Sequence, residues 1–270
     1  MESEITRIDI ALVKRSLAIS REKAQSLISS GLVTINGKPC KKASEKVSLN
    51  DDIIVCGSDL PYVSRGGLKL EKALKVFDYK VEGAVAMDIG ASTGGFTDVL
   101  LQNGAKKVYA IDVGHGQLDP RIASDPRVIS MEHTNARALE PKMFPEIPCL
   151  AVMDVSFISV KLILPAAFRV LGKDGRMISL IKPQFEAGRP NIGKGGIVSK
   201  RSVHEDVLKS IIDYVPALGW QVEALDYSPI AGGDGNIEFL AAMAPYENSR
   251  SLITESYIQN LVKKAHIALK

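Results

Sequence analysis

Four charged residues of this chain occupy positions that predict chemistry rather than a solvated surface. Lys182 directly follows one apolar strand pattern, and Asp154 ends another. A charge at the end of a buried strand is costly unless it has a partner or a function. If the strands lie parallel, both side chains project from one edge of the sheet, where open α/β sheets bind ligands. With Lys69 on an earlier helix and Glu238 at the start of the last strand, two cations and two anions would surround one cleft.

Such a cluster suits the activation of a weak oxygen nucleophile. A ribose hydroxyl must lose or polarise its proton as it attacks, and a lysine amine accepts that proton when neighbouring cations or desolvation favour its neutral form. Nearby carboxylates would orient the amine. If the electrophile is an already activated methyl group, the remaining task is in-line positioning. For Lys182 taken alone, the competing interpretation is a strand-end lysine whose charge reaches solvent.

Residues 87–98 predict a site for a nucleotide-like ligand at the same edge. The segment Met-Asp-Ile-Gly-Ala-Ser-Thr-Gly-Gly-Phe-Thr-Asp follows an apolar run and precedes a stretch of helical length. This layout places backbone N–H groups and a helix N-terminus at the end of a strand. The spacing Gly90-x-x-x-Gly94-Gly95 differs from the G-x-G-x-x-G of dinucleotide binders, which argues against a plain nicotinamide enzyme. A tight strand–helix turn is the simpler alternative.

Two acids in register with this loop favour ligand binding. Asp88 lies in the strand before the loop, and Asp112 ends the next strand 24 residues later. An acid at the second position can accept hydrogen bonds from ribose hydroxyls. The segment His133-Thr-Asn135 follows a third strand pattern, where an adenine contact and a role in shaping the loop are equally consistent with the sequence.

The elements that must position these residues alternate between strands and helices from residue 68 onward. Such alternation predicts a mostly parallel sheet with helices on both faces. The predicted strands cover 84–89, 107–111, 128–131, 149–153, 176–181, 221–225 and 237–243, and the predicted helices cover 68–77, 97–103, 159–171, 203–218 and 249–270.

The first fifty residues carry the basic excess of the chain. They hold nine Lys or Arg and five Asp or Glu, a net charge of +4, whereas the remaining residues hold 25 and 26, a net charge of −1. A small basic module beside a near-neutral domain indicates a polyanionic partner. We expect this module to cover residues 1–56, a linker to cover 57–67 and a second domain to cover 68–270.

Within the module, the sequence predicts two short helices and a hairpin. The helices cover 5–15 and 21–29; Ser20 would cap the second at its N-terminus, and Gly31 would end it. A hairpin through Asn36-Gly37 and a last strand at 53–55 follow.

This module resembles the S-four RNA-binding domain over about residues 5–56. The resemblance rests on Arg7-Ile8-Asp9, Leu17, Ser20-Arg21, Ala24, Ile28, Gly31, Val33 and Ile35-Asn36-Gly37. It implies that the two helices present basic side chains to structured RNA. The basic residues expected to contact RNA are Lys14, Arg15, Arg21, Lys23, Lys38, Lys41 and Lys42, together with Arg65 in the linker.

The remainder of the chain resembles the FtsJ-like 2′-O-ribose methyltransferases. Lys69, Asp154, Lys182 and Glu238 match that family's Lys-Asp-Lys-Glu tetrad in order, and residues 88–96 resemble its cofactor loop. The segments Asp154-Val-Ser-Phe and Lys182-Pro-Gln-Phe-Glu resemble the subgroup fused to an S-four domain, the TlyA family, also known as haemolysin A. The resemblance covers essentially the whole chain.

The resemblance implies a fold, a reaction and roles for individual residues. The fold is α/β, a Rossmann-like class I methyltransferase with a small N-terminal α+β domain. The reaction is 2′-O-methylation of cytidine in ribosomal RNA or ribosomal subunits, with S-adenosylmethionine as the donor. Lys182 is the implied base or polariser, oriented by the other three members of the tetrad. The implied cofactor-lining residues are Asp88, Gly90, Thr93, Gly94, Gly95, Phe96, Asp112 and Asp154.

Other enzyme classes fit the motifs less well. An amino-group methyltransferase would carry Asn/Asp-Pro-Pro-Tyr/Phe, and Asp154-Val-Ser-Phe lacks both prolines. A cytosine-C5 methyltransferase would need a cysteine nucleophile, whereas Cys149 begins a strand pattern and is expected in the core. A non-catalytic ribosome-assembly factor remains an alternative, and it would predict a degenerate tetrad. The basic, glycine-rich segment 188–200 would either close over RNA on binding or form a plain surface loop.

Composition favours an ordinary globular protein in a reduced compartment. The chain is 46% hydrophobic and 24% charged, and its three scattered cysteines show no metal-ligand spacing. The acidic N-terminus lacks an apolar leader, and the most apolar long stretch is a poor membrane span. We therefore expect a cytoplasmic protein without metal or membrane partners, and we disfavour a membrane-active haemolysin. The sequence leaves the oligomeric state open.

Overall fold

The structure, a computed structural model, forms two compact units. It describes residues 5–15, 17–18, 21–29, 31–48, 51–55, 61–232, 235–246 and 253–269. One unit comprises Met1–Pro61 and the other comprises Tyr62–Lys270. The second unit therefore begins before residue 68, where the sequence suggested the linker would end.

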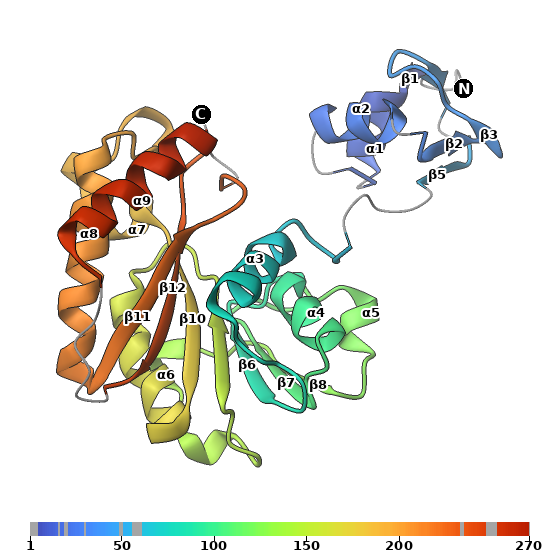
Figure 1. Cartoon of the computed structure of the whole chain (residues 1–270). Helices are drawn as coiled ribbons and strands as arrows, with labels where there is room; N and C mark the ends of the chain where they lie inside the picture. The colour runs from blue at the N-terminus through green and yellow to red at the C-terminus, as the bar shows by residue number, and fades with distance from the viewer. Residues whose placement is uncertain are drawn as a thin grey trace. The chain divides into compact units, whose positions relative to one another are not determined.

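A seven-stranded sheet forms the centre of the second unit (Figure 1). Its strand order is β11-β12-β10-β9-β6-β7-β8. Neighbours from β10 to β8 pair in parallel, while β12 runs antiparallel to both β10 and β11. The strands are β6 Val85–Ile89, β7 Lys107–Ile111, β8 Val128–Met131, β9 Leu150–Met153, β10 Arg176–Ile181, β11 Trp220–Tyr227 and β12 Phe239–Pro245. The predicted mostly parallel sheet is confirmed.

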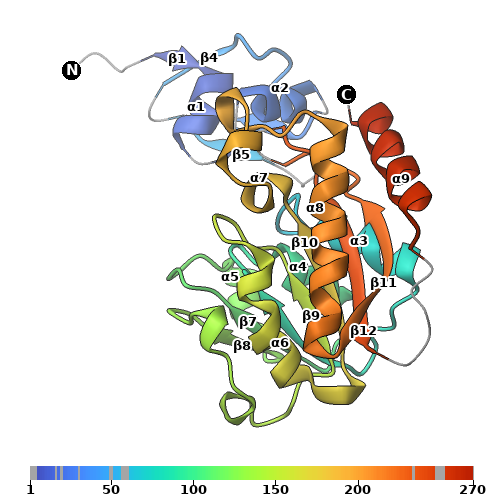
Figure 2. The same cartoon turned by 90° about the vertical axis from the view of Figure 1, so that its left-hand side faces the viewer.

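Helices cover both faces of this sheet (Figures 1 and 2). Val85, Met87 and Ile89 point into a core shared with α6, α8 and α9, whereas Ala86 points into a core shared with α3, α4 and α5. The two cores separate because successive side chains of a strand face opposite sides of the sheet. The helices are α3 Gly67–Phe77, α4 Gly95–Gln102, α5 Pro120–Ala123, α6 Leu164–Leu171, α7 Pro183–Glu186, α8 Arg201–Tyr214 and α9 Glu255–Ala268.

Most differences from the predicted elements lie at their ends. The helix expected over 159–171 starts as a 3-10 turn at Val160–Leu162, and α6 follows with Pro165 in its first turn, where the ring is tolerated. The helices α5 and α7 were not predicted, because four residues give too short a pattern. The predicted beginning of the last helix at 249–252 and its last residue, 270, lie outside the described residues.

The placement of Cys149 corrects a prediction. We expected a core side chain, but Cys149 is exposed and immediately precedes β9. Because β9 runs parallel to β6, the amino end of β9 lies at the opposite edge of the sheet from Asp154. This separation removes Cys149 as a nucleophile for the strand-end cluster.

One edge of the sheet collects the charged residues. Asp112, Asp154 and Lys182 follow the carboxyl ends of β7, β9 and β10, which run in the same direction. The antiparallel strand β12 presents its amino end there, because Phe239 pairs with Ile181. Glu238, which precedes β12, therefore lies at the same edge as Lys182, which follows β10.

The segment before α3 packs against α4 and belongs to the second unit. Tyr62 is buried and its hydroxyl donates to Glu71 at 3.0 Å, while Val63 N donates to Asp98 Oδ2 at 2.8 Å. A Cβ on Gly95, the first residue of α4, would lie 2.1 Å from Ser64 Oγ. Glycine at this position therefore permits the segment to lie directly on the helix N-terminus.

The first unit is a small α+β domain. Its helices and strands are β1 Thr6–Arg7, α1 Ile8–Lys14, α2 Arg21–Ser29, β2 Val33–Ile35, β3 Lys38–Pro39, β4 Lys46–Val47 and β5 Ile53–Val55. Ile8, Leu12 and Ile28 are the centre of its core. Asn36 and Gly37 have φ of 49° and 76°, as the predicted hairpin requires. Gly31 ends α2 with φ of 73°, also as predicted, and Ser20 lies outside the described residues.

None of the helices in the described part of the chain is long and apolar enough to cross a membrane.

Candidate active site

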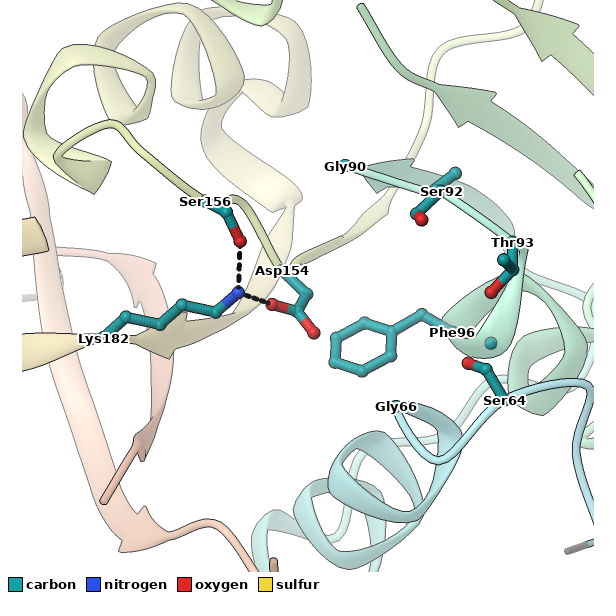
Figure 3. A pocket seen from close by; sticks show the side chains of 11 residues that line it. Ser64, Gly66, Gly90, Ser92, Thr93, Phe96, Asp154, Ser156 and Lys182 are labelled. Atoms are coloured by element: carbon teal, nitrogen blue, oxygen red, sulfur yellow. Dashed lines mark hydrogen bonds and ion pairs between the residues drawn. The ribbon is translucent and has the colours of Figure 1, made fainter. Parts of the chain in front are cut away.

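The four charged residues at the sheet edge form one continuous chain of contacts. Lys182 Nζ lies 2.6 Å from Asp154 Oδ1, and Lys69 Nζ lies 3.6 Å from Asp154 Oδ2 and 2.6 Å from Glu238 Oε2. Lys182 Nζ also donates a hydrogen bond to Ser156 Oγ at 2.9 Å, as Figure 3 shows. The structure therefore brings together all four residues that the sequence placed around one cleft.

These ion pairs are formed by buried side chains and not at the protein surface. Lys69 and Glu238 are 8% and 2% exposed, and Lys182 is 9% exposed. Burial lowers the pKa of Lys69, but the carboxylates of Asp154 and Glu238 together raise that pKa further, so its net shift is upward. Lys69 is thus fixed as a cation between two carboxylates, and it limits the negative charge that Asp154 presents to Lys182.

Glu238 is enclosed by a close approach of the backbone. A Cβ on Gly232 would lie 2.6 Å from Glu238 Oε1, so only glycine fits there without displacing the carboxylate. Ser228 N donates to the carbonyl of Glu238 at 2.9 Å and continues the β11–β12 pairing to this point. These contacts hold the far end of the tetrad in place.

Two cavities meet at Asp154. The larger has a volume of about 370 Å³ and its lining includes Asp112, Thr134 and Asn135. The smaller, shown in Figure 3, has a volume of about 190 Å³ and its lining includes Thr93, Phe96 and Lys182. Gly90, Ser92, Asp154 and Ser156 line both. A ligand in the larger cavity would therefore approach Lys182 across Asp154.

The glycine loop is shaped by this close approach to Asp154. Gly90 has φ of 84°, and a Cβ on it would lie 2.6 Å from the carbonyl oxygen of Asp154. Gly94 has φ of 91° and precedes α4. Both positions use backbone conformations that favour glycine. The loop thus lies directly against Asp154 because Gly90 has no Cβ to keep it away.

Asp112 is oriented by two backbone donors. Ser92 N donates to its Oδ2 and Gly114 N donates to its Oδ1, each at 2.8 Å. The carboxylate also lines the larger cavity, with each oxygen retaining a free lone-pair direction. This is the arrangement needed to accept hydrogen bonds from a diol such as ribose.

Asp88 occupies a different position from the other acids. It is fully buried and lines neither cavity; Thr97 Oγ1 donates to its Oδ2 at 2.7 Å. Its Oδ1 is buried without a hydrogen-bond partner. Burial raises its pKa to about 7, and the nearby charge of Asp154 adds to the rise. Asp88 therefore contacts α4 through Thr97 and lines neither cavity, contrary to the prediction that it lines the cofactor site.

The larger cavity has a mixed polar and apolar lining. The larger cavity lies within the ~300–1,000 Å³ range of small-molecule sites. Its lining combines the Asp112 carboxylate with the apolar side chains of Ile111, Ile158 and Ile163. In the described residues, no group of three or more His, Cys, Asp or Glu is placed to hold a metal ion.

The segment 133–135 partly lines the larger cavity and partly shapes its own loop. Thr134 and Asn135 line the larger cavity, while Asn135 Oδ1 also accepts from Arg137 N at 3.1 Å and caps a short 3-10 turn. His133 is exposed, has φ of 52° and stacks on His115 with ring centroids 5.0 Å apart. It does not line the cavity.

Several residues of the site were missed by sequence reasoning. Ser64, Ser92 and Ser156 line the cavities, and Ser156 holds Lys182. Phe157 is 92% exposed and has φ of 64°. Its ring centroid lies 5.2 Å from that of Phe185. Ser156 and Phe157 belong to the Asp154-Val-Ser-Phe motif, which was the available signal. The serines elsewhere carry no signal because serine is common in loops.

The basic residues of the first unit divide into two groups. Arg15 donates to the carbonyls of Asp51 and Ser48 at 2.7 and 2.8 Å, and Arg21 donates to Asp9 at 3.0 Å. These two guanidinium groups therefore help to hold their own unit together. The remaining predicted residues are Lys14 and Lys23 on α1 and α2, Lys38 in β3, Lys41 and Lys42 after it, and Arg65, which lies in the second unit.

Asp9 is the centre of a buried charge cluster in the first unit. It is fully buried and accepts from Arg7, Arg21 and Gln25. The hydrogen bond from Arg7, followed by those from Gln25 and Arg21, holds the pKa of Asp9 far below its usual value despite burial. The Arg7-Ile8-Asp9 motif is therefore structural in this unit.

Comparison with known proteins agrees with the two-unit architecture. A family profile described as FtsJ-like methyltransferase matches residues 62–244, and one described as S4 domain matches residues 6–53. The proposed rRNA methyltransferase YqxC of Bacillus subtilis is 48% identical over 273 residues, which cover 100% of this chain and 97% of that protein. The 16S/23S rRNA (cytidine-2′-O)-methyltransferase TlyA of Mycobacterium tuberculosis is 42% identical over 234 residues, 86% of this chain and 87% of that protein.

A solved structure is also similar over nearly the whole chain. It is that of a proposed hemolysin from Streptococcus thermophilus, with a TM-score of 0.78 at 47% identity. The similarity covers 98% of this chain and 96% of that one.

Proposed function

Since this chain belongs to the FtsJ-like methyltransferase family and carries an S4 domain, we propose that it methylates the 2′-hydroxyl of a cytidine in ribosomal RNA. The Mycobacterium tuberculosis relative is named for this reaction on 16S and 23S rRNA. The observation that carries the proposal is the contact chain Lys182–Asp154–Lys69–Glu238 at the point where two cavities meet. We expect the reaction to take place in the cytoplasm.

S-adenosylmethionine is the expected methyl donor, and when bound it supplies an electrophilic methyl group. The larger cavity would hold it: Asp112 would accept from the ribose hydroxyls, and Thr134 and Asn135 would lie against the base. The backbone of Gly90 and Ser92 would lie against the part of S-adenosylmethionine that enters the smaller cavity. Asp88 and Gly94 would shape this site without lining it.

Lys182 Nζ would hold the proton of the attacking hydroxyl. Its contacts with Asp154 Oδ1 and Ser156 Oγ orient the nitrogen toward the smaller cavity and leave one direction for a substrate oxygen. As the oxygen attacks, its proton passes to Nζ, and Asp154 stabilises the ammonium that forms. Lys69 counters part of the charge of Asp154, so the Asp154 carboxylate is shared between the two lysines.

The first unit would supply affinity for structured RNA. Exposed lysines such as Lys38, Lys41 and Lys42 would contact phosphates, which contribute affinity and orientation but little sequence selectivity. Arg65 follows Ser64, which lines the smaller cavity, and it would contact RNA close to the reacting ribose.

The decisive experiment is mass-spectrometric mapping of 2′-O-methyl nucleosides in ribosomal RNA from cells with and without the protein. We expect a 2′-O-methylcytidine that disappears on deletion and returns when the wild-type chain, but not Lys182→Met, is restored. An unchanged modification pattern would exclude this function and favour a non-catalytic role in ribosome assembly.

A further inference from the structure

Asn236 is buried beside the tetrad, and both polar atoms of its side chain bind one loop. Its exposed fraction is 1%. Its Nδ2 donates to the carbonyl of Gly196 at 3.0 Å, and Val198 N donates to its Oδ1 at 2.9 Å. A primary amide both donates and accepts, so Asn236 satisfies a carbonyl and an N–H of the loop at once.

The loop that Asn236 binds covers residues 188–200 and is basic. Arg189, Lys194 and Lys200 are exposed, and no Asp or Glu lies between residues 187 and 202. Gly195 and Gly196 have φ of 75° and 78°. Glycines give a loop many accessible conformations, so selection of one conformation depends on fixed points such as Asn236.

The same residue is connected to the catalytic edge. Asn236 lies two residues before Glu238, and Gly232 N donates to its carbonyl at 2.9 Å. Gly232 in turn encloses Glu238 Oε1. The other end of the loop joins Lys182 through α7 Pro183–Glu186. The loop is therefore attached near both ends of the tetrad.

We propose that Asn236 is a positioning residue that holds loop 188–200 as an RNA-binding surface of the methyltransferase unit. The proposal rests on the function proposed above and specifies how the second unit grips its substrate. The loop's basic side chains bind the phosphates that flank the target nucleotide, and the amide keeps them in register with Lys182. Because phosphate contacts position the RNA, loss of the amide raises KM for RNA and leaves the chemical step intact.

The test compares Asn236→Ala with Asn103→Ala in steady-state methylation of ribosomal RNA. Asn103, the C-terminal cap of α4, is an exposed control: its Nδ2 also donates to a backbone carbonyl, that of Val99 at 2.8 Å, but it does not bind the loop. We expect Asn236→Ala to raise KM for RNA about tenfold, the loss typical of a hydrogen-bonded buried group. We expect kcat to stay within about twofold, as in other losses of uniform binding. The dissociation constant for S-adenosylmethionine, from calorimetry, should not change.

A second variant separates positioning from general destabilisation. Replacing Arg189, Lys194 and Lys200 together with glutamine touches no buried group and should give the same rise in KM. Adding the glutamine substitutions to Asn236→Ala should raise KM little further, because both variants lose the same contacts between the loop and RNA. An unchanged KM in the glutamine variant would overturn the proposal, as would a fall in kcat alone in Asn236→Ala. Absence of methylation by the wild-type chain would instead refute the function on which the proposal rests.

Discussion

Lys69 and Lys182 share one carboxylate, each contacting a different oxygen of Asp154. Lys182 Nζ lies 2.6 Å from Oδ1, and Lys69 Nζ lies 3.6 Å from Oδ2. The two lysines are not equivalent, because Lys69 has a second, closer carboxylate in Glu238. Lys69 is therefore the structural cation of the group, and Lys182 is the one placed toward the smaller cavity.

Lys182→Met should abolish methyl transfer and leave cofactor binding intact. A positioned general base contributes about 10²- to 10⁴-fold to a reaction rate, and methionine keeps an unbranched, slightly shorter side chain without a basic nitrogen. The measurements are tritium incorporation into ribosomal RNA and calorimetric titration with S-adenosylmethionine. Lys173→Met, on an exposed lysine, is the control. Wild-type rates in Lys182→Met would exclude the proposed mechanism.

Removing one member of the Lys69–Glu238 pair should destabilise the protein more than removing both. Breaking a buried pair typically costs about 3–5 kcal/mol, because the remaining charge is uncompensated. We expect Lys69→Met to show the larger loss, since it leaves Glu238 and Asp154 close to each other without a cation between them. The double variant Lys69→Met/Glu238→Gln should recover much of the stability but none of the activity.

Urea unfolding and methyl-transfer assays on the same preparations test this prediction. Additive losses of stability in the double variant would show that the two side chains do not interact.

Gly90→Ala should impair the site beyond the cost of its backbone conformation. The added Cβ would lie 2.6 Å from the carbonyl oxygen of Asp154, so the loop or Asp154 must move. Gly83→Ala is the matched control, because Gly83 also has positive φ, 72°, but has open space around its Cβ position. We expect both variants to lose stability and only Gly90→Ala to lose cofactor affinity and kcat. Equal cofactor affinity in the two variants would contradict this reading.

Asp88 should make stability depend on pH between about 4 and 7. Its folded-state pKa is raised from 3.8 to about 7, so the folded protein binds a proton that the unfolded chain releases. This contribution is fully present below pH 4 and is lost as pH rises through 7. A shift of this size corresponds to at most about 4 kcal/mol. Asp88→Asn should flatten the profile of unfolding free energy in this range; a profile identical to that of the wild type would refute the assignment.

The basic residues of the first unit should separate into RNA contacts and structural groups. Lys41→Gln/Lys42→Gln should weaken RNA binding and lower the salt dependence of log K by about 2, one unit for each phosphate contact. Arg21→Ala should instead lower the melting temperature of this unit, because it removes a partner of buried Asp9. Filter binding across a salt series and thermal unfolding distinguish the two effects. Unaltered salt dependence in the lysine variant would remove these residues from the interface.

Strand ends were the most informative part of the sequence. A lysine and an aspartate after two apolar runs are improbable unless they meet, and the parallel sheet places them on one edge. The positions of Gly90 and Gly94 likewise followed from residue type, because each uses a backbone conformation that favours glycine. Two features could not be predicted. The helices α5 and α7 are only four residues long, which is too short for a periodic pattern. The exposure of Cys149 depends on what packs around the end of its strand, which local periodicity does not indicate.

The sequence by itself determined the identity and order of the four charged residues, the alternation of strands and helices, and the basic character of the first fifty residues. Only the tertiary structure decided that Asp154 lies between the two lysines, that Glu238 reaches the edge through an antiparallel strand, and that Asn236 holds the basic loop. These relationships join residues from 28 to 169 positions apart in the chain. Such contacts are set by strand order and packing, which local residue patterns do not encode.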